Sequence, residues 1–287
     1  MIRGCNADGA TGGGADAELE WVDASKSFWR GGRHNEAIRS VSFSVGRGER
    51  VALTGPSGCG KTTLLNMAAG FVRPTGGFVR HAGRMVTGVN TSVGYVTQRD
   101  TVLPWRTVRR NVELALEIRG VSRRERGSRV TECLDLVGLS EFDRAYPSEL
   151  SGGMLKRLLL ARTLVYGPRA LLLDEPFGAL DAQLRLAMHA ELQRIWATLG
   201  TTIVFVTHDI AEAVALADRV LVFGGAPARL VMSRVIEVPK GLDPFQMQFD
   251  PACVAVMREL WEALGPEALR RDSNLPERSP HSAQVTQ

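Results

Sequence analysis

The sequence predicts an α/β fold built around a mainly parallel β-sheet. Short apolar runs alternate with longer segments of helical periodicity, which is typical of strands and helices packed in layers. The chain has 287 residues, 44% of them hydrophobic and 23% charged. That is enough apolar material for one large domain or two small ones, and it excludes a generally disordered chain.

The predicted sheet contains three apolar runs that are bounded by turn or cap residues. These runs are Arg50–Thr54, Leu171–Leu173 and Thr202–Thr207. Near-continuous apolar runs of this length are typical of strands buried on both faces. Helical patterns follow the first and third runs, and we expect a long helix over Asp181–Leu199 after the second.

Two segments depart from this alternation. Leu19–Val45 suggests antiparallel strands broken by a polar turn at Arg30–Asn35. The stretch of about 99–166 has apolar positions at helical spacing, including Val112 and Leu116, and no strand pattern. We therefore expect an N-terminal antiparallel β subdomain and an inserted all-helical subdomain. The insertion is rich in arginine, which we interpret as a solvated face in preference to a lipid-headgroup surface.

The remaining segments set the expected limits of the domain. Residues 1–17 and 266–287 are poor in core-forming residues, so we expect two disordered tails and a folded domain at 18–240. Residues 241–265 are expected to form a short helical extension, with one helix at about Phe245–Leu264. No run of 18 apolar residues occurs, so no membrane span is expected.

Charge and cysteine usage point to the cytoplasm. The net charge of +4 is a mild excess that permits an anionic partner without requiring one. The N-terminal residues contain no apolar segment of the kind that a secretory signal needs. Because the four cysteines lie far apart and form no CxxC pair, we expect neither a disulfide framework nor a zinc site.

A phosphate-binding loop follows the first strand. The pattern GxxxxGK[ST] is matched by Gly55-Pro56-Ser57-Gly58-Cys59-Gly60-Lys61-Thr62, and Thr63 continues into a predicted helix. Glycines let backbone N–H groups turn toward phosphates, and the helix N-terminus adds its positive dipole end. Lys61 is expected to reach the β- and γ-phosphates, and the Thr62 hydroxyl to ligate Mg²⁺. A Gly-rich turn with a capping Thr is the alternative.

The second predicted strand ends in two acids, Asp174 and Glu175. Asp174 would lie beside the Mg²⁺, and Glu175 would orient or deprotonate the attacking water. Two acids that merely cap a strand end are the alternative, which the phosphate loop upstream disfavours.

Further motifs resemble those of ABC ATPases. Leu150-Ser151-Gly152-Gly153-Met154 is similar to the LSGGQ signature of that family. Gln98 matches the Q-loop, Asp181 the D-loop and His208 the switch histidine, all in the family's order. Phe28 matches the aromatic residue that stacks on adenine, with Trp29 as a neighbouring substitute and a core position as the alternative.

The resemblance implies an α/β P-loop NTPase (RecA-like) core that binds ATP and Mg²⁺. It implies catalytic roles for Glu175, His208, Lys61 and Gln98, with Thr62, Gln98 and Asp174 as metal ligands. The nucleotide would be bound by Phe28, the phosphate loop through Thr63, Ser151, Gly152, Gly153 and Asp181. In this family the signature of one subunit closes on the nucleotide of another, so a homodimer or a pair with a paralogous ATPase subunit is implied.

One branch of the family is especially similar. Leu103–Val108, Asp174–Asp181 and Thr207–Ala213 resemble the ATPase subunits of nitrate/sulfonate/taurine importers. This resemblance implies a peripheral subunit at the cytoplasmic face of the inner membrane. It would work on integral-membrane permease subunits and indirectly with an extracytoplasmic solute-binding protein. Trp105 would anchor the permease contact, with a local core position as the alternative.

Two other functions remain as alternatives at this stage. A soluble ABC ATPase acting on nucleic acid would need a basic stripe beyond what +4 suggests, so no nucleic acid partner is expected. A non-hydrolysing ATP switch is disfavoured by Glu175 and His208.

The signature departs from the family's pattern at Met154 and at Leu155-Lys156, which replaces a commonly polar pair that includes Gln, and the phosphate loop contains a cysteine. Met154 stands where the family has Gln, which bears on subunit closure and not on ATP binding. Cys59 lies near a helix N-terminus, a setting that favours the thiolate, so we expect alkylation to inactivate the protein and ATP to protect it.

Overall fold

The structure is a computed structural model that describes residues 16–97, 102–178, 182–237, 244–247 and 249–265. Within these ranges six strands form the central sheet, in the order β10-β9-β3-β8-β7-β6. Neighbouring strands from β9 to β6 are parallel, and β10 pairs antiparallel at one edge. The α/β prediction and the positions of its strands are confirmed to within a residue or two. The strands are β3 (Arg50–Thr54), β6 (Val93–Val96), β7 (Ala170–Asp174), β8 (Thr202–Val206), β9 (Arg219–Gly224) and β10 (Arg229–Val235).

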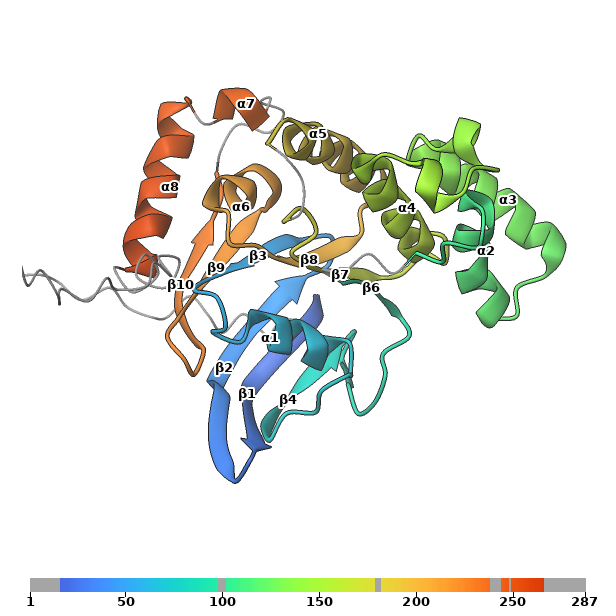
Figure 1. The fold of residues 1–287 in the computed structure, drawn as a ribbon. Helices are drawn as coiled ribbons and strands as arrows, with labels where there is room; N and C mark the ends of the chain where they lie inside the picture. Colours follow the sequence, from blue (N-terminus) through green and yellow to red (C-terminus); the bar gives the residue numbers. More distant parts are fainter. Residues whose placement is uncertain (1–15, 98–101, 179–181, 238–243, 248, 266–287) are drawn as a thin grey trace, which may run out of the picture.

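Helices cover both faces of this sheet (Figure 1). α1 (Lys61–Ala68) lies between the central sheet and a second, antiparallel sheet, and the indole of Trp21 donates to the Leu64 carbonyl across that contact at 3.2 Å. The opposite face packs against α5 (Ala182–Leu199), α6 (Ile210–Leu216) and α8 (Pro251–Leu264). The central sheet therefore separates two hydrophobic cores, one on each of its faces.

The C-terminal helix is shorter than predicted. Instead of one helix over Phe245–Leu264, the chain forms α7 (Pro244–Met247) and then α8. Asp250 caps α8, accepting from the N–H groups of Ala252 and Cys253 at 2.9 and 3.0 Å, and Pro251 occupies the first helical position. An N-cap followed by proline starts a new helix, so the continuous helix expected here is wrong.

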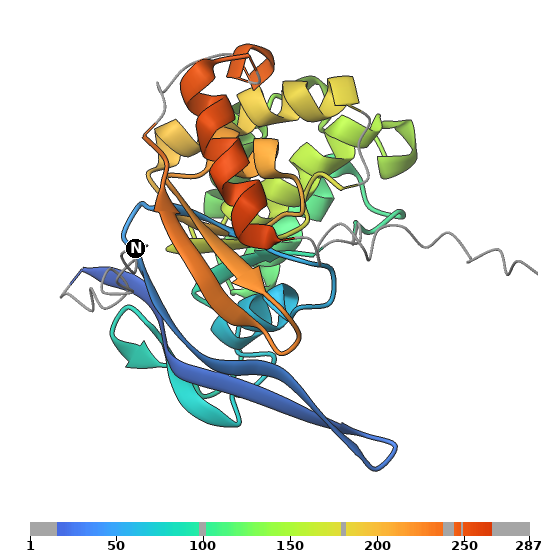
Figure 2. The same cartoon turned by 90° about the vertical axis from the view of Figure 1, so that its left-hand side faces the viewer.

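The antiparallel sheet has the order β2-β1-β4-β5 among the described residues. Its strands are β1 (Ala17–Arg30), β2 (Arg33–Gly46), β4 (Gly76–His81) and β5 (Arg84–Met85). Ala17 belongs to β1 and not to the N-terminal tail expected for 1–17. The turn is tighter than the Arg30–Asn35 expectation, because Gly31 and Gly32 both take positive φ, +56° and +75°, as a two-residue hairpin turn requires. Figure 2 shows this hairpin extending away from the body of the molecule.

The helical insertion lies between β6 and β7 in the chain, at one end of the molecule (Figure 1). It contains α2 (Val108–Ile118), α3 (Arg123–Leu136), two short 3₁₀ turns (Ser140–Phe142 and Pro147–Glu149) and α4 (Gly152–Leu164). Its buried side chains include Val112, Leu116, Val130, Leu134 and Val137. The described part of this segment holds no strand, as expected.

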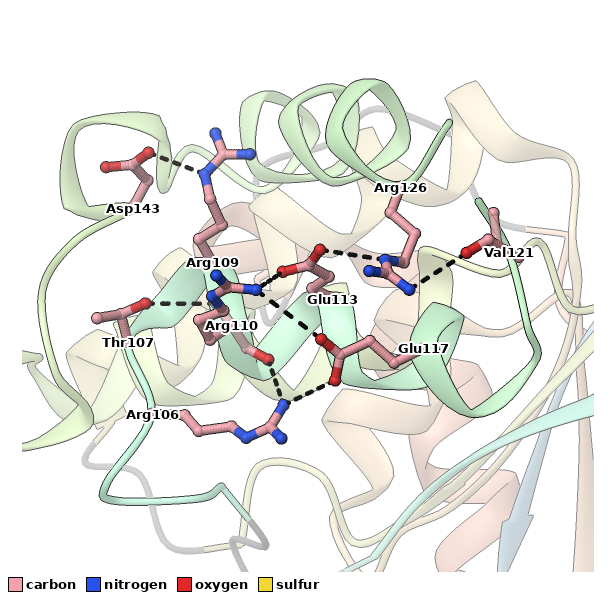
Figure 3. A network of polar contacts seen from close by, with 9 residues as sticks. All are labelled: Arg106, Thr107, Arg109, Arg110, Glu113, Glu117, Val121, Arg126 and Asp143. Carbon is pink, nitrogen blue, oxygen red and sulfur yellow. Dashed lines mark hydrogen bonds and ion pairs between the residues drawn. The ribbon is translucent and has the colours of Figure 1, made fainter. Parts of the chain in front are cut away.

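Arginines of this insertion are paired with acids (Figure 3). Glu113, which is buried, lies 2.8 Å from Arg110 and 3.1 Å from Arg126. Glu117 lies 3.0 Å from Arg106, and Arg109 contacts Asp143 at 3.0 Å. The arginine-rich surface is thus an ion-paired network.

Across the described ranges, no helix has both the length and the apolar character that crossing a bilayer would take.

Candidate functional site

The phosphate loop connects β3 to α1, and two of its glycines lie too close to neighbouring backbone for any side chain. Gly55 has φ +153°, and a Cβ there would lie 2.3 Å from the Phe223 carbonyl oxygen of β9. Gly60 has φ +115°, and a Cβ would lie 2.8 Å from the Ala37 carbonyl oxygen of β2. Gly58 also has a positive φ, +76°. The glycines predicted from the motif are therefore required by this backbone.

Lys61 lies at the centre of the loop and is buried. Its ammonium donates to the carbonyl oxygens of Gly55 at 2.7 Å and Pro56 at 3.0 Å. Ser57 and Gly58 are exposed at the rim, and Thr63 is half-buried on the first turn of α1. The loop thus wraps around one positive charge at a helix N-terminus, an arrangement suited to an anion.

Cys59 does not meet the expectation of a reactive thiol. Only 1% of its surface is exposed, and its sulfur lies 3.8 Å from the Lys61 ammonium. A thiol buried to this degree is shielded from an alkylating reagent, so the structure argues against ready modification at this position.

Thr62 and Asp174 meet at the carboxyl end of the sheet, although 112 residues separate them. The Thr62 hydroxyl donates to Oδ1 of Asp174 at 2.9 Å. Burial raises the pKa of the Asp174 carboxyl, and the hydrogen bond from Thr62 lowers it. A buried carboxylate beside a hydroxyl provides two of the oxygen ligands that Mg²⁺ prefers, the others coming from phosphate and water. The residues present therefore fit this metal.

Glu175 and His208 lie beside this pair. Oε1 of Glu175 is 3.8 Å from Nδ1 of His208, whose side chain is 58% exposed. Glu175 adopts a left-handed backbone with φ +47°, and its N–H donates to the Val206 carbonyl of β8 at 3.1 Å. Two neighbouring strand ends therefore bring a carboxylate and an imidazole together, as general acid–base chemistry requires.

Phe28 lies on the β-hairpin that touches the phosphate loop. It pairs with Asn35, is 39% exposed, and has the Lys26 ammonium 5.0 Å from its ring centroid. The same hairpin supplies Ala37, which contacts Gly60 of the loop. Phe28 is thus an accessible aromatic face and not a core residue. Trp29 beside it is 75% exposed.

The signature residues begin α4. The Ser151 hydroxyl caps the helix by accepting from the Met154 N–H at 3.3 Å. Ser151 and Gly152 are exposed, and a Cβ at the buried Gly153 would lie 2.7 Å from Leu184 of α5. Met154 packs against the core cluster that contains the helical insertion. Gln98 and Asp181 lie outside the described residues, so their predicted roles remain predictions.

Trp105 is 72% exposed, so the core alternative for this residue is wrong. The loop that carries it is held by Asn111, a fully buried residue of α2 that the motif analysis did not single out. The Asn111 amide accepts from the Leu103 N–H at 2.8 Å and donates to the carbonyls of Leu103, Arg106 and Thr107 at 2.9–3.1 Å. An asparagine in an otherwise apolar helical pattern was the available signal.

Comparison with known proteins agrees with this site. A model of the ABC transporter family matches residues 38–178. The nitrate import ATP-binding protein NrtD of Synechocystis sp. is 42% identical over 221 residues, covering 77% of this chain and 83% of that protein. The taurine import ATP-binding protein TauB of Pseudomonas aeruginosa is 44% identical over 207 residues, covering 72% of this chain and 79% of that protein.

A solved structure extends the likeness to three dimensions. The ATP-binding cassette MJ0796, described as a dimer in a post-hydrolysis state bound to ADP and Pi, has a TM-score of 0.67 and 29% sequence identity. The match covers 77% of this chain and 100% of that one. The chain therefore belongs to the ABC transporter family and is one of its ATP-binding subunits, enzymes that hydrolyse ATP to drive transport.

Proposed function

We propose that this chain powers the import of a small molecule of the nitrate, sulfonate or taurine class. The observation that carries the proposal is the meeting of Thr62 with Asp174 and of Glu175 with His208 at one edge of the sheet. The relatives named for nitrate and taurine import supply the substrate class.

The residues divide the work of hydrolysis as follows. Lys61 and the backbone N–H groups of the phosphate loop bind and neutralise the β- and γ-phosphates. Thr62 and Asp174, with Gln98, would hold Mg²⁺, which would neutralise charge on the phosphates. Glu175 accepts the proton of the attacking water, and His208 orients that water and the γ-phosphate. Phe28 stacks on the adenine.

A second ATPase subunit completes the site. Ser151, Gly152 and Gly153 lie at the N-terminus of α4, which favours a phosphate presented from outside the chain. Asp181 is assigned to the same contact. The dimeric state named for the cassette MJ0796 supports a nucleotide sandwich of two copies of this chain, or of this chain with a paralogous subunit.

Trp105 supports a contact with permease subunits. A rigid loop, fixed by Asn111, presents this indole to solvent, and exposed Trp is enriched among the residues that dominate interface energies. We place the chain on the cytoplasmic face of the inner membrane, beneath a permease that receives substrate from a solute-binding protein outside.

A nucleic acid substrate is disfavoured by the charges of the helical insertion. Arg106, Arg109, Arg110 and Arg126 are each within 3.1 Å of a carboxylate (Figure 3). Arginines neutralised in this way contribute little to the phosphate contacts on which nucleic acid affinity depends.

Co-purification from membranes tests the proposal. The tagged chain is expected to retain a permease and a solute-binding protein, and ligand screening of the latter identifies the cargo. Trp105→Ala should release the permease while ATP hydrolysis by the purified subunit continues. Trp261→Ala is the matched control, since Trp261 is 48% exposed on α8. A permease that co-purifies equally with Trp105→Ala would contradict the docking role, and the absence of any membrane partner would contradict the proposed function.

A further inference from the structure

Behind Glu175 and His208, two buried polar side chains face each other between α5 and α6. Nε2 of His189 on α5 lies 4.0 Å from Oε2 of Glu212 on α6, and each side chain is 5% exposed. Neither residue has been given a role in the site above, although Glu212 lies within the Thr207–Ala213 stretch. Around this pair both helices contribute apolar residues, among them Met188, Leu192, Ala213 and Leu216. Gln193 of α5 also donates to the Ala215 carbonyl of α6 at 2.7 Å.

This pair is incompletely satisfied. Among the described residues, Nε2 of His189 and Oε1 of Glu212 have no hydrogen-bond partner. A buried polar atom without a partner is expensive, and two apolar side chains would fill the same space without that penalty. The 4.0 Å separation is close enough for a small side-chain rotation to bring the two groups into a hydrogen bond.

The pair connects the two segments that carry the candidate catalytic residues. The His189 ring packs edge-on against Phe177, 5.0 Å between centroids, and Phe177 is two residues after Glu175. Glu212 lies four residues after His208, on the first turn of α6. Asp209 caps that turn and also contacts Arg185 of α5 at 3.2 Å. The turn bearing His208 is therefore joined to α5 by the Asp209–Arg185 contact and lies against α5 where Glu212 faces His189.

The surroundings keep both groups neutral near pH 7. Burial raises the pKa of Glu212 to about 8, and the charges of Asp209 and Glu175 act in the same direction. The hydrogen bond from Thr207 and the charge of Arg185 oppose this shift. Burial lowers the pKa of His189 to about 4. From α8, on the other side of α6, the buried residues are Cys253, Val256, Leu260 and Leu264, of which only the Cys253 thiol titrates.

We propose that a protonated Glu212 donates a hydrogen bond to His189 and so positions the turn that carries His208 against α5. Ionisation of Glu212 replaces that bond with a buried negative charge near Asp209 and Glu175, and the turn loses its position. Glu212 and His189 are positioning residues, and the inference rests on the proposed role of His208.

The pH dependence of ATP hydrolysis tests the pair. In the wild type, turnover should fall about tenfold between about pH 7 and pH 9, as it does when one group must stay protonated. Glu212→Gln keeps a neutral donor at every pH, so its turnover should be flat over this range. Glu262→Gln, the same change on an exposed face of α8, should follow the wild type. If the turnover of Glu212→Gln falls at alkaline pH as it does in the wild type, the inference is wrong.

A measurement on the wild type tests the pairing even if the Glu212 variant does not fold. The NMR signals of the His189 ring should shift with an inflection near pH 8, where Glu212 ionises, and unshifted signals would overturn the pairing. His208→Ala separates the two proposals. If that variant hydrolyses ATP normally, the role proposed for His208 fails. If it is inactive while Glu212→Gln retains the wild-type pH profile, only the pairing fails.

Discussion

Glu175 holds a left-handed backbone conformation, φ +47°, that residues with a Cβ rarely adopt. Such conformations cost about 1–3 kcal/mol and persist where neighbouring structure enforces them. Here the N–H of Glu175 is fixed by the Val206 carbonyl, so the strand beside it maintains the strained turn. A glycine would relieve the strain, but it would also remove the carboxylate that faces His208.

Glu175→Gln removes the proposed base and keeps the shape of the side chain. We expect turnover to fall about 10²–10⁴-fold, the usual contribution of general base catalysis, while ATP binding remains. The variant should therefore accumulate ATP-bound dimers, visible by light scattering coupled to gel filtration. Glu132→Gln, on the exposed face of α3, is the control. Near-normal turnover in Glu175→Gln would remove this residue from its assigned role.

At the scale of elements, Asn111 ties the start of α2 to the loop before it. The loop is fixed to α2 by one backbone N–H and three carbonyls bonded to this single side chain. The result is an irregular loop that projects Trp105 from a rigid base. Stiffness at this point lowers the entropy that must be lost when a partner binds.

Asn111→Ala is expected to destabilise the domain by about 1–3 kcal/mol, because it leaves buried backbone groups without partners. The loss should be local, so amide exchange at Leu103 should accelerate more than exchange in the central strands. Asn35→Ala, at an exposed position of β2, should change neither quantity. Unchanged exchange at Leu103 would show that the loop does not depend on Asn111.

Elements with strong local signals were predictable from the sequence. β7 and β8 are buried at every position, and their unbroken apolar runs reflect this. β9 was not predicted although its Val220–Phe223 run is buried, and β10 was not predicted because it is an edge strand whose residues alternate between exposed and half-buried. The division between α7 and α8 was missed because apolar spacing continues across it, although Asp250-Pro251 carried the signal.

The residues of the site likewise include some that the sequence predicted and some that it did not. Motif spacing predicted the residues of the phosphate loop and the meeting of Thr62 with Asp174. It could not predict Glu212 and His189, which look like ordinary polar positions on amphipathic helices. Only the packing of α5 against α6 shows that both are buried and face each other.

At the scale of the whole molecule, the same pair sets a pH dependence of stability. Below pH 8 the folded chain retains on Glu212 a proton that the unfolded chain releases above about pH 4.5. His189 acts oppositely, since the unfolded chain binds its proton below about pH 6.5 and the folded chain does so only near pH 4. The two effects cancel between about pH 4.5 and 6.5.

Between about pH 6.5 and 8 only the Glu212 term remains, and the free energy of unfolding should fall by about 2 kcal/mol, at about 1.4 kcal/mol per pH unit. Denaturant unfolding across this range measures it. Glu212→Gln should remove the slope, and Glu262→Gln should keep it. An equal slope in all three proteins would assign the proton to another group.

The order of strands in the central sheet has a consequence for synthesis on the ribosome. β3, which leads into the phosphate loop, lies between β8 and β9 and touches no strand that precedes it in the chain within that sheet. Gly55 also approaches the carbonyl of Phe223. A nascent chain that has emerged only as far as the signature therefore lacks both neighbours of β3. We therefore expect that ATP does not act as a folding template for the N-terminal half, and that newly made chains need β8 and β9 before the nucleotide can stabilise them.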